Sequence, residues 1–108
     1  MASEMGVVVL DDPANGRLIL YLSGAVNAGS ARLLRDTART CADAGAGVVV
    51  DCSQAESLDA AGLQVIIALS RKLRAKNLKL HLSQPSDAVR AVLRMVALGD
   101  EFQMDGEP

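Results

Sequence analysis

The chain has 108 residues, half of them apolar, and a net charge of −2, which fits one domain with a buried core. Its aromatic residues are Tyr21 and Phe102 alone, so the chain lacks an aromatic surface for stacking bases, and it has no basic block. It also lacks an apolar run of about 20 residues and a signal-like N-terminus. We therefore expect a cytoplasmic domain that neither binds nucleic acid nor inserts into a membrane.

The N-terminal part of the sequence predicts a hairpin followed by a helix. Two apolar runs, Gly6 to Leu10 and Arg17 to Leu22, flank turn formers that end in Asn15-Gly16, a pair that favours positive φ. Ser30 is the expected N-cap of a helix that ends near Ala44. The apolar face of this helix is predicted to hold Leu33, Leu34, Thr37, Ala38 and Cys41.

Strands and helices alternate in the rest of the chain. The run Val48 to Val50 is typical of a central strand, and Asp51 behind it is expected to cap a turn. A helix is predicted from Ala60 to Lys76, a half-buried strand from Leu78 to Leu82, and a third helix from Pro85-Ser86 to Gly99. The inward face of the second helix is predicted to hold Leu63, Ile66, Leu69, Ser70 and Leu73.

The resulting order, β-β-α-β-α-β-α, predicts an α/β fold with one domain over residues 1–104 and a polar tail over residues 105–108. Strands that alternate with helices require right-handed crossovers onto one mixed sheet. That sheet has four or five strands, because Asp100 to Met104 forms either a last short strand or a turn.

Residues that could carry out catalysis or hold a cofactor are scarce. Gly45-Ala46-Gly47 precedes a strand, whereas a nucleotide-binding loop follows one. His81 is the single histidine, and no serine elbow accompanies it. Cys41 and Cys52 have no CxxC partner and are expected to be buried, reduced thiols. We therefore expect no catalytic activity, no cofactor and no metal site.

The segment from Asp59 to Leu63 places a carboxylate, two methyl side chains and a glycine where a strand passes into the second helix. Asp59 could cap this helix or meet a cation of a partner, and the two roles are compatible. It also disfavours a bound anion, because its charge occupies the positive end of the helix dipole. The outer face of this helix is small and weakly charged. Its alanines could be present simply because alanine is a good helix former, or they could allow a partner protein to approach closely.

Taken in order, Val48-Val49-Val50-Asp51, the D-x-x-G-L turn at Asp59 to Leu63 and Pro85-Ser86 resemble the STAS family, the anti-sigma factor antagonists of bacteria. The segment from Leu22 to Asn27 is similar to the family's L-x-G-E-L-D segment. The resemblance implies a mixed sheet with helices mainly on one face and, as partner, an anti-sigma serine kinase. In the family this kinase phosphorylates the second residue of a D-S-S-G or D-S-T-G turn, and the added charge breaks binding.

The chain departs from that pattern at the turn itself. Ala61 stands at the phosphoacceptor position and Ala60 at the serine before it, while Ala25 and Asn27 replace the usual Glu and Asp. The resemblance thus implies a non-enzymatic, protein-binding regulatory module that is not phosphorylated here. The alternative is a STAS subunit of a chemotaxis cluster or an ABC lipid-transport complex, which Gln64 favours. The predicted partner-binding residues are Asp59, Ala60, Ala61, Gly62, Gln64, Ile67, Ala68, Arg71 and Asn27.

Overall fold

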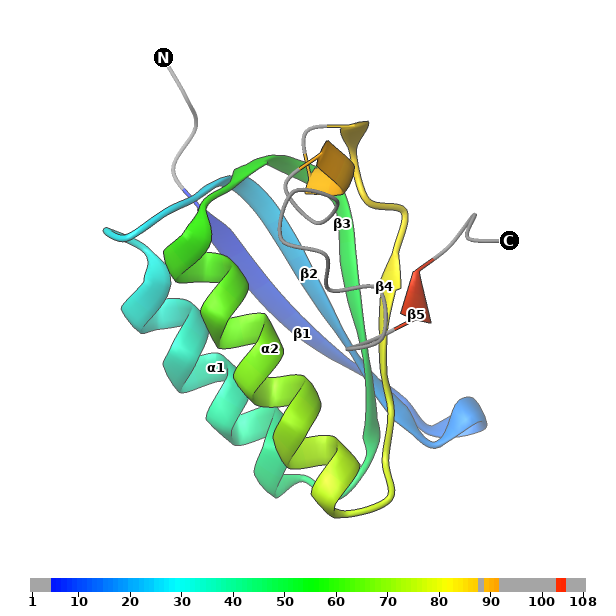
Figure 1. Ribbon diagram of the computed structural model, residues 1–108. Coiled ribbons are helices and arrows are strands. Elements are labelled where there is room, and N and C mark those ends of the chain that lie inside the picture. The colour runs from blue at the N-terminus through cyan, green and yellow to red at the C-terminus, as the bar shows by residue number, and fades with distance from the viewer. Residues whose placement is uncertain (1–4, 88, 92–102, 105–108) are drawn as a thin grey trace.

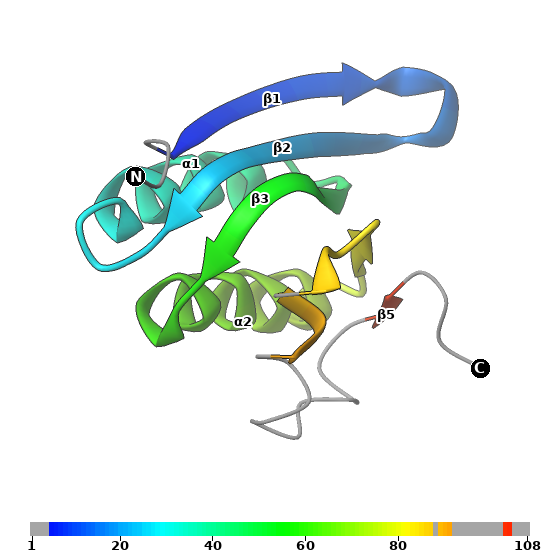
Figure 2. The same ribbon diagram turned by 90° about the horizontal axis from the view of Figure 1, so that it is seen from above.

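The fold is a mixed sheet with two parallel helices on one face (Figures 1 and 2), as seen in a computed structural model that describes residues 5–87, 89–91 and 103–104. The five strands lie in chain order, the first pair antiparallel and the others parallel. The predicted α/β class and sheet are confirmed. The elements are β1 (Gly6–Asp12), the 3₁₀ helix η1 (Pro13–Asn15), β2 (Arg17–Val26), α1 (Ala31–Asp43), β3 (Gly47–Leu58), α2 (Ala60–Ala75), β4 (Leu80–Ser83) and β5 (Gln103–Met104).

The core lies between the sheet and the two helices. From α2 it receives all five residues of the predicted inward face, each of them buried, so the predicted helix phase is confirmed. Alternate residues of the three central strands meet them from the sheet, as the two-residue period of a strand requires. These sheet residues are Leu20, Leu22, Val48, Val50, Leu80 and Leu82.

The hairpin between β1 and β2 forms as predicted, with Gly16 at a φ of 64°. β1 is the outer strand of the sheet. By register, Val8 lies opposite Tyr21 and Leu10 opposite Ile19, on the face away from the helices. Val8 and Leu10 are 55% and 52% exposed. This outer face is therefore partly apolar.

The apolar face predicted for α1 was wrong at one position. Leu33 is 53% exposed, and Thr37 is half-buried, with its hydroxyl donating to the Leu33 carbonyl at 2.9 Å. The buried stripe is rotated away from Leu33, since at 100° per residue the stripe through Leu34 and Cys41 also takes in small alanines that fit beside the sheet. The buried residues of α1 are Ala31, Leu34, Ala38, Cys41 and Ala42.

β3 is much longer than the apolar run from Val48 to Val50, and it contains two bulges. Its register with β2 shifts once between Tyr21 and Ser23 and again between Gly24 and Ala25. Asp51 lies inside the strand and not at its end, so the expected terminal cap was wrong. Its Oδ1 accepts from the Ser53 amide at 2.9 Å and the Ser53 hydroxyl at 2.7 Å, which stabilises the first bulge.

A helical turn begins after Pro85, as predicted. The Ser86 hydroxyl accepts from the Val89 amide at 3.3 Å, residues 87 and 89–91 are helical, and Val89 is fully buried. β5 supplies the short last strand and pairs with β4. The remainder of the predicted third helix, with Val92, Leu93, Val96 and Gly99, lies outside the described residues, as does the tail of residues 105–108.

Candidate functional site

The candidate site is the surface formed by the loop after β2 and the start of α2. Because β2 and β3 are parallel, their carboxyl ends meet at one end of the sheet, where α/β folds commonly place binding loops. Figure 1 shows the loop of residues 27–30 beside the first turn of α2. Segments about thirty residues apart in the chain therefore build one surface.

Asp59 joins the parts of this surface. Its Oδ1 accepts from the Gly62 amide at 3.1 Å, so it is the N-cap of α2. Its Oδ2 accepts from the Ala28 amide at 3.1 Å, and its own amide donates to the Val26 carbonyl at 2.9 Å. The expectation that Asp59 caps the helix is confirmed, and the same carboxylate also holds the neighbouring loop.

The loop before α1 is shaped by Asn27 and Ser30. The Asn27 Oδ1 accepts from the Gly29 amide at 2.9 Å and from the Ser30 amide at 3.3 Å. In return, the Ser30 hydroxyl accepts from the Asn27 amide at 2.9 Å. Ser30 is the N-cap residue of α1, as predicted, but its side chain makes no capping hydrogen bond to the helix. Its hydroxyl is engaged in the loop, since Asn27 offers it a closer partner.

Gly62 allows α2 to start close to β2 and β3. A Cβ at this position would lie 2.5 Å from Cγ1 of Val26 and 2.9 Å from Cδ1 of Leu58. Both neighbours are buried, so neither has open space to move into. The glycine of the D-x-x-G-L turn is therefore required by packing.

The other residues predicted to bind a partner separate into two groups. Ile67 is only 6% exposed and packs in the core, so it does not belong to the outer surface. Ala61 is half-buried against the core. The residues of α2 that reach the surface beside the turn are Ala60, Gln64, Ala68 and Arg71. With Asp59, Ala61 and Asn27 they form what we call the turn face.

The turn face holds little reactive chemistry. Methyl groups occupy positions 60 and 61, where a hydroxyl would be needed to accept a phosphoryl group. Across residues 5–87, 89–91 and 103–104, no group of three His, Cys, Asp or Glu side chains could hold a metal ion. In the same part of the chain no helix is long and apolar enough to cross a membrane.

A groove between α1 and α2 adjoins the turn face and was not predicted. It has a volume of about 220 Å³ and shares Gln64 and Ala68 with that face. Its other lining residues come from both helices, namely Arg35, Ala38, Arg39, Val65, Leu69 and Lys72. Periodicity places each residue on its own helix but not one helix against the other. Only the i, i+4 pair of arginines on α1 hints at the groove in the sequence.

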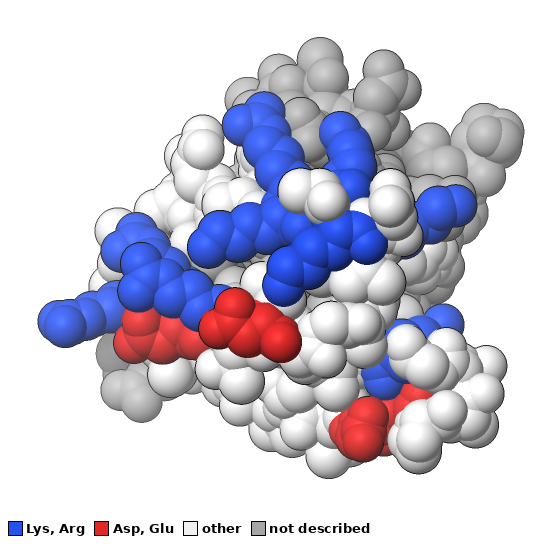
Figure 3. Space-filling model, turned by 90° about the horizontal axis from the view of Figure 1, so that it is seen from below, with Lys and Arg blue, Asp and Glu red and all other residues white. Residues whose placement is uncertain are grey.

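Basic side chains are concentrated around the end of α2. From Arg71 to Lys79 the chain has five basic residues and no acidic one. The Lys76 Nζ donates to the Ala42 carbonyl at 2.6 Å. This contact places a positive charge at the C-terminus of α1, where the helix dipole stabilises a cation. Figure 3 shows the Lys and Arg side chains gathered on this side of the molecule, with Asp and Glu confined to two separate places.

A mixed sheet with two parallel helices on one face, and a carboxylate-capped turn at the carboxyl ends of its strands, defines a small α/β domain. The STAS domain family matches residues 7–107, so the chain belongs to that family. A search of curated proteins gave no match.

Solved structures support the same fold. An anti-sigma factor antagonist from Mycobacterium paratuberculosis has a TM-score of 0.85 and 20% identity, covering 96% of this chain and 87% of that one. The anti-sigma factor antagonist SpoIIAA in its unphosphorylated form has a TM-score of 0.77 and 19% identity, covering 94% and 90%. Phosphorylated SpoIIAA from Bacillus has a TM-score of 0.71 and 18% identity, covering 94% and 93%.

Proposed function

We propose that this chain is a STAS regulatory module that binds an anti-sigma serine kinase through the turn face and is not switched by phosphorylation at the turn. The observation that carries the proposal is the arrangement around Asp59. One carboxylate fixes both the loop of residues 27–30 and the start of α2. That surface has methyl groups at Ala60 and Ala61. It is thus pre-shaped for a protein and carries no phosphoacceptor at the turn.

The physical reason for a constitutive interaction is the absence of a hydroxyl that could be phosphorylated at the turn. A phosphate adds about −1.5 to −2 charges and would break a packed protein interface. Without a hydroxyl at position 61, that repulsion has no place to arise at this turn. We further propose that the module has no catalytic activity and acts in the cytoplasm, where sigma factors and their regulators meet.

Phosphorylation is tested by incubating the protein with a candidate anti-sigma serine kinase and ATP, and by mapping any phosphate with mass spectrometry. We expect no phosphate on the wild type, whereas the Ala61→Ser variant should carry phosphate on its new hydroxyl. High occupancy at Ser53 or Ser57, which are both exposed, would instead mean that another site has taken over the switch.

Binding is tested by calorimetric titration of the same kinase in the presence of ADP or ATP. Ala68→Arg places a long cation into a close contact, and Ala61→Glu places a charge at the turn, so both are expected to weaken binding at least tenfold. Ala14→Arg is the matched control, because Ala14 is exposed on η1 at the opposite end of β2. Melting curves check that each variant is folded.

Two results would contradict the proposal. If Ala68→Arg and Ala61→Glu both bind like the wild type while folded, the partner docks elsewhere. If the kinase does not bind and the chain instead co-purifies in a stable complex with a transporter ATPase or a chemotaxis protein, the module is a subunit of that assembly.

A further inference from the structure

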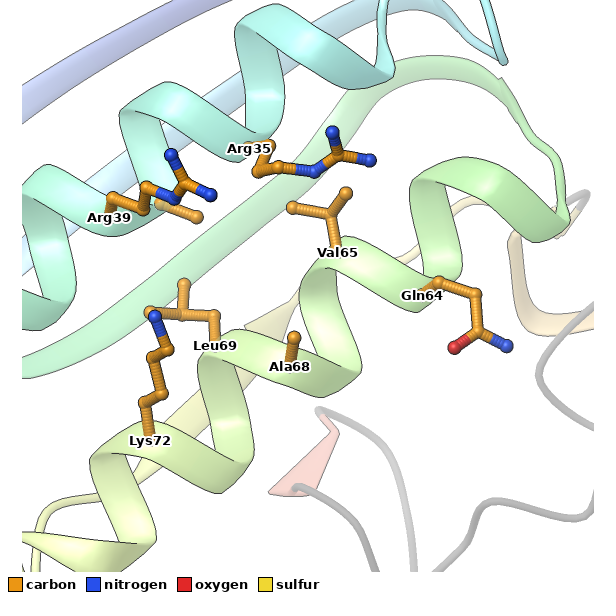
Figure 4. Close-up of a pocket in the computed structure, with 8 residues that line it drawn as sticks. Arg35, Arg39, Gln64, Val65, Ala68, Leu69 and Lys72 are labelled. Carbon is orange, nitrogen blue, oxygen red and sulfur yellow. The ribbon is translucent and has the colours of Figure 1, made fainter.

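A groove lies between α1 and α2, next to the turn face. Figure 4 shows Arg35 and Arg39 reaching over it from α1, with Val65, Leu69 and Lys72 facing them from α2. Gln64 points away from α1 on the side of the turn. The groove therefore opens between the two helices and runs along them.

The floor of the groove is apolar and small. Ala38 and Val65 are each 6% exposed and Leu69 is 3% exposed, while Ala68 forms part of the wall. The volume of about 220 Å³ is below the roughly 300–1,000 Å³ of pockets for drug-sized ligands. It exceeds the roughly 150 Å³ that holds a benzene molecule. This size suits one or two apolar side chains of a protein.

The rim of the groove is cationic. Arg35, Arg39 and Lys72 are exposed and no acidic residue lines the groove. Within the described part of the chain, none of these three cations forms an ion pair with a carboxylate. Three like charges around one opening repel each other, and a carboxylate-bearing partner would relieve that repulsion.

We propose that this groove receives an amphipathic helix of a protein partner, with an apolar side chain in the floor and carboxylates against Arg35, Arg39 and Lys72. Two parallel helices leave a furrow into which a third helix fits, with its side chains at positions i, i+3 or i+4 as anchors. This proposal rests on the proposed function, because the groove and the turn face share Gln64 and Ala68. It extends that function by assigning the partner an acidic, amphipathic helix. A buried apolar anchor within a charged rim is a common arrangement of interface hot spots.

The test uses two synthetic helix-forming peptides of about 18 residues, long enough to be helical in water. One has leucine at every third or fourth position and glutamate beside each leucine; the other has glutamine in place of every glutamate. Each is titrated into ¹⁵N-labelled protein and followed by NMR. We expect the acidic peptide to shift the amides of Ala38, Val65, Ala68 and Leu69, and to bind more weakly as salt is raised.

Charge-reversal variants test whether the rim cations bind the acidic peptide. Arg39 and Lys72 lie outside the turn face, and Arg39→Glu and Lys72→Glu are each expected to raise the dissociation constant of the acidic peptide about fivefold. Lys79→Glu is the matched control, since Lys79 is exposed, makes the same charge change and does not line the groove. It is expected to leave the dissociation constant unchanged.

Equal affinity for the two peptides, unchanged binding in Arg39→Glu and Lys72→Glu, or shifts confined to other surfaces would each overturn the proposal. So would binding of wild-type protein to phosphatidylglycerol vesicles that is lost in Lys72→Glu while the peptides fail to bind, because the cations would then serve a membrane surface. The proposed function fails separately: in that case Ala61→Glu binds the kinase like the wild type. If only Ala61→Glu weakens kinase binding and Lys72→Glu does not, the turn face stands and the groove proposal fails.

Discussion

Asp59 performs two tasks with its two oxygens, and substitution can separate them. Asp59→Ala removes both the cap and the link to Ala28, and we expect a loss of about 1–2 kcal/mol in the free energy of unfolding. Asp59→Asn should keep the cap, since Asn caps as well as Asp, but its NH₂ group would face the Ala28 amide, a donor against a donor. Urea unfolding and amide hydrogen exchange at Ala28 measure the two effects.

The contrast between these variants is the control. In Asp59→Asn, stability should stay within about 0.5 kcal/mol of the wild type, while exchange at Ala28 becomes faster. Equal exchange in both proteins would mean that the carboxylate does not hold the loop.

At Gly62, close packing and helix propensity oppose each other. Replacing a helical Gly with Ala gains about 1 kcal/mol from propensity, whereas the new methyl would overlap Val26 and Leu58. Overpacking of a tight core costs about 1–3 kcal/mol, so Gly62→Ala should lower the melting temperature. A higher melting temperature would contradict the close approach. Gly45→Ala is unsuitable for comparison because its φ of 74° already disfavours a side chain.

Helix phase can be tested at the scale of an element with a matched pair of leucines. Leu69 of α2 is 3% exposed and Leu33 of α1 is 53% exposed. Leu69→Ala removes buried contacts and leaves a cavity, so we expect a loss of about 2–5 kcal/mol. Leu33→Ala should change stability by less than about 0.5 kcal/mol. Denaturant unfolding of both variants decides whether α1 is oriented as the structure places it.

The sequence alone could predict the elements with strong periodicity and not those that depend on their neighbours. The inward face of α2 was predictable because it is long and its apolar spacing is regular. Leu33 was misplaced because three alanines complete the buried stripe of α1 beside Leu34 and Cys41, and a search for apolar spacing favours large side chains over small ones. The length of β3 could not be read either, since its two bulges interrupt the alternation that marks a strand.

The candidate site was predictable in the same uneven way. Asp59 and Gly62 carry local signals, a helix cap and a glycine after a strand, and both have structural roles. Ile67 was misplaced because a residue at the border of a helix face is buried or exposed according to its neighbours. The groove depends on the distance between two helices, so no local pattern could reveal Lys72.

For the whole molecule, the two buried thiols report unfolding from different elements. Cys41 on α1 and Cys52 on β3 are 0% and 1% exposed. Burial raises the pKa of Cys41, and burial together with the Asp51 carboxylate raises the pKa of Cys52 to about 12. Since the thiolate is the reactive form, we expect neither to react with a disulfide reagent in the native protein and both to react in urea.

The raised pKa values also give the direction of the pH dependence. Each thiol holds its proton more tightly in the folded protein than in the unfolded chain. Its contribution to the free energy of unfolding is therefore complete below the ordinary thiol pKa of 9.0. That contribution is lost as pH rises from there toward about 12. The urea concentration at the midpoint of unfolding should therefore fall as the pH rises through this alkaline range. Fast labelling of Cys52 alone under native conditions would reveal local opening of β3.

The free edge of β1 determines how this molecule behaves when many copies are crowded together. Val8, Val9 and Leu10 are exposed on an outer strand, where unpaired backbone groups can template a further strand. The charges on this strand, Asp11 and Asp12, stand at its hairpin end, so repulsion protects one end of the edge and leaves the other open. Self-association in concentrated samples should accordingly start along residues 7–10.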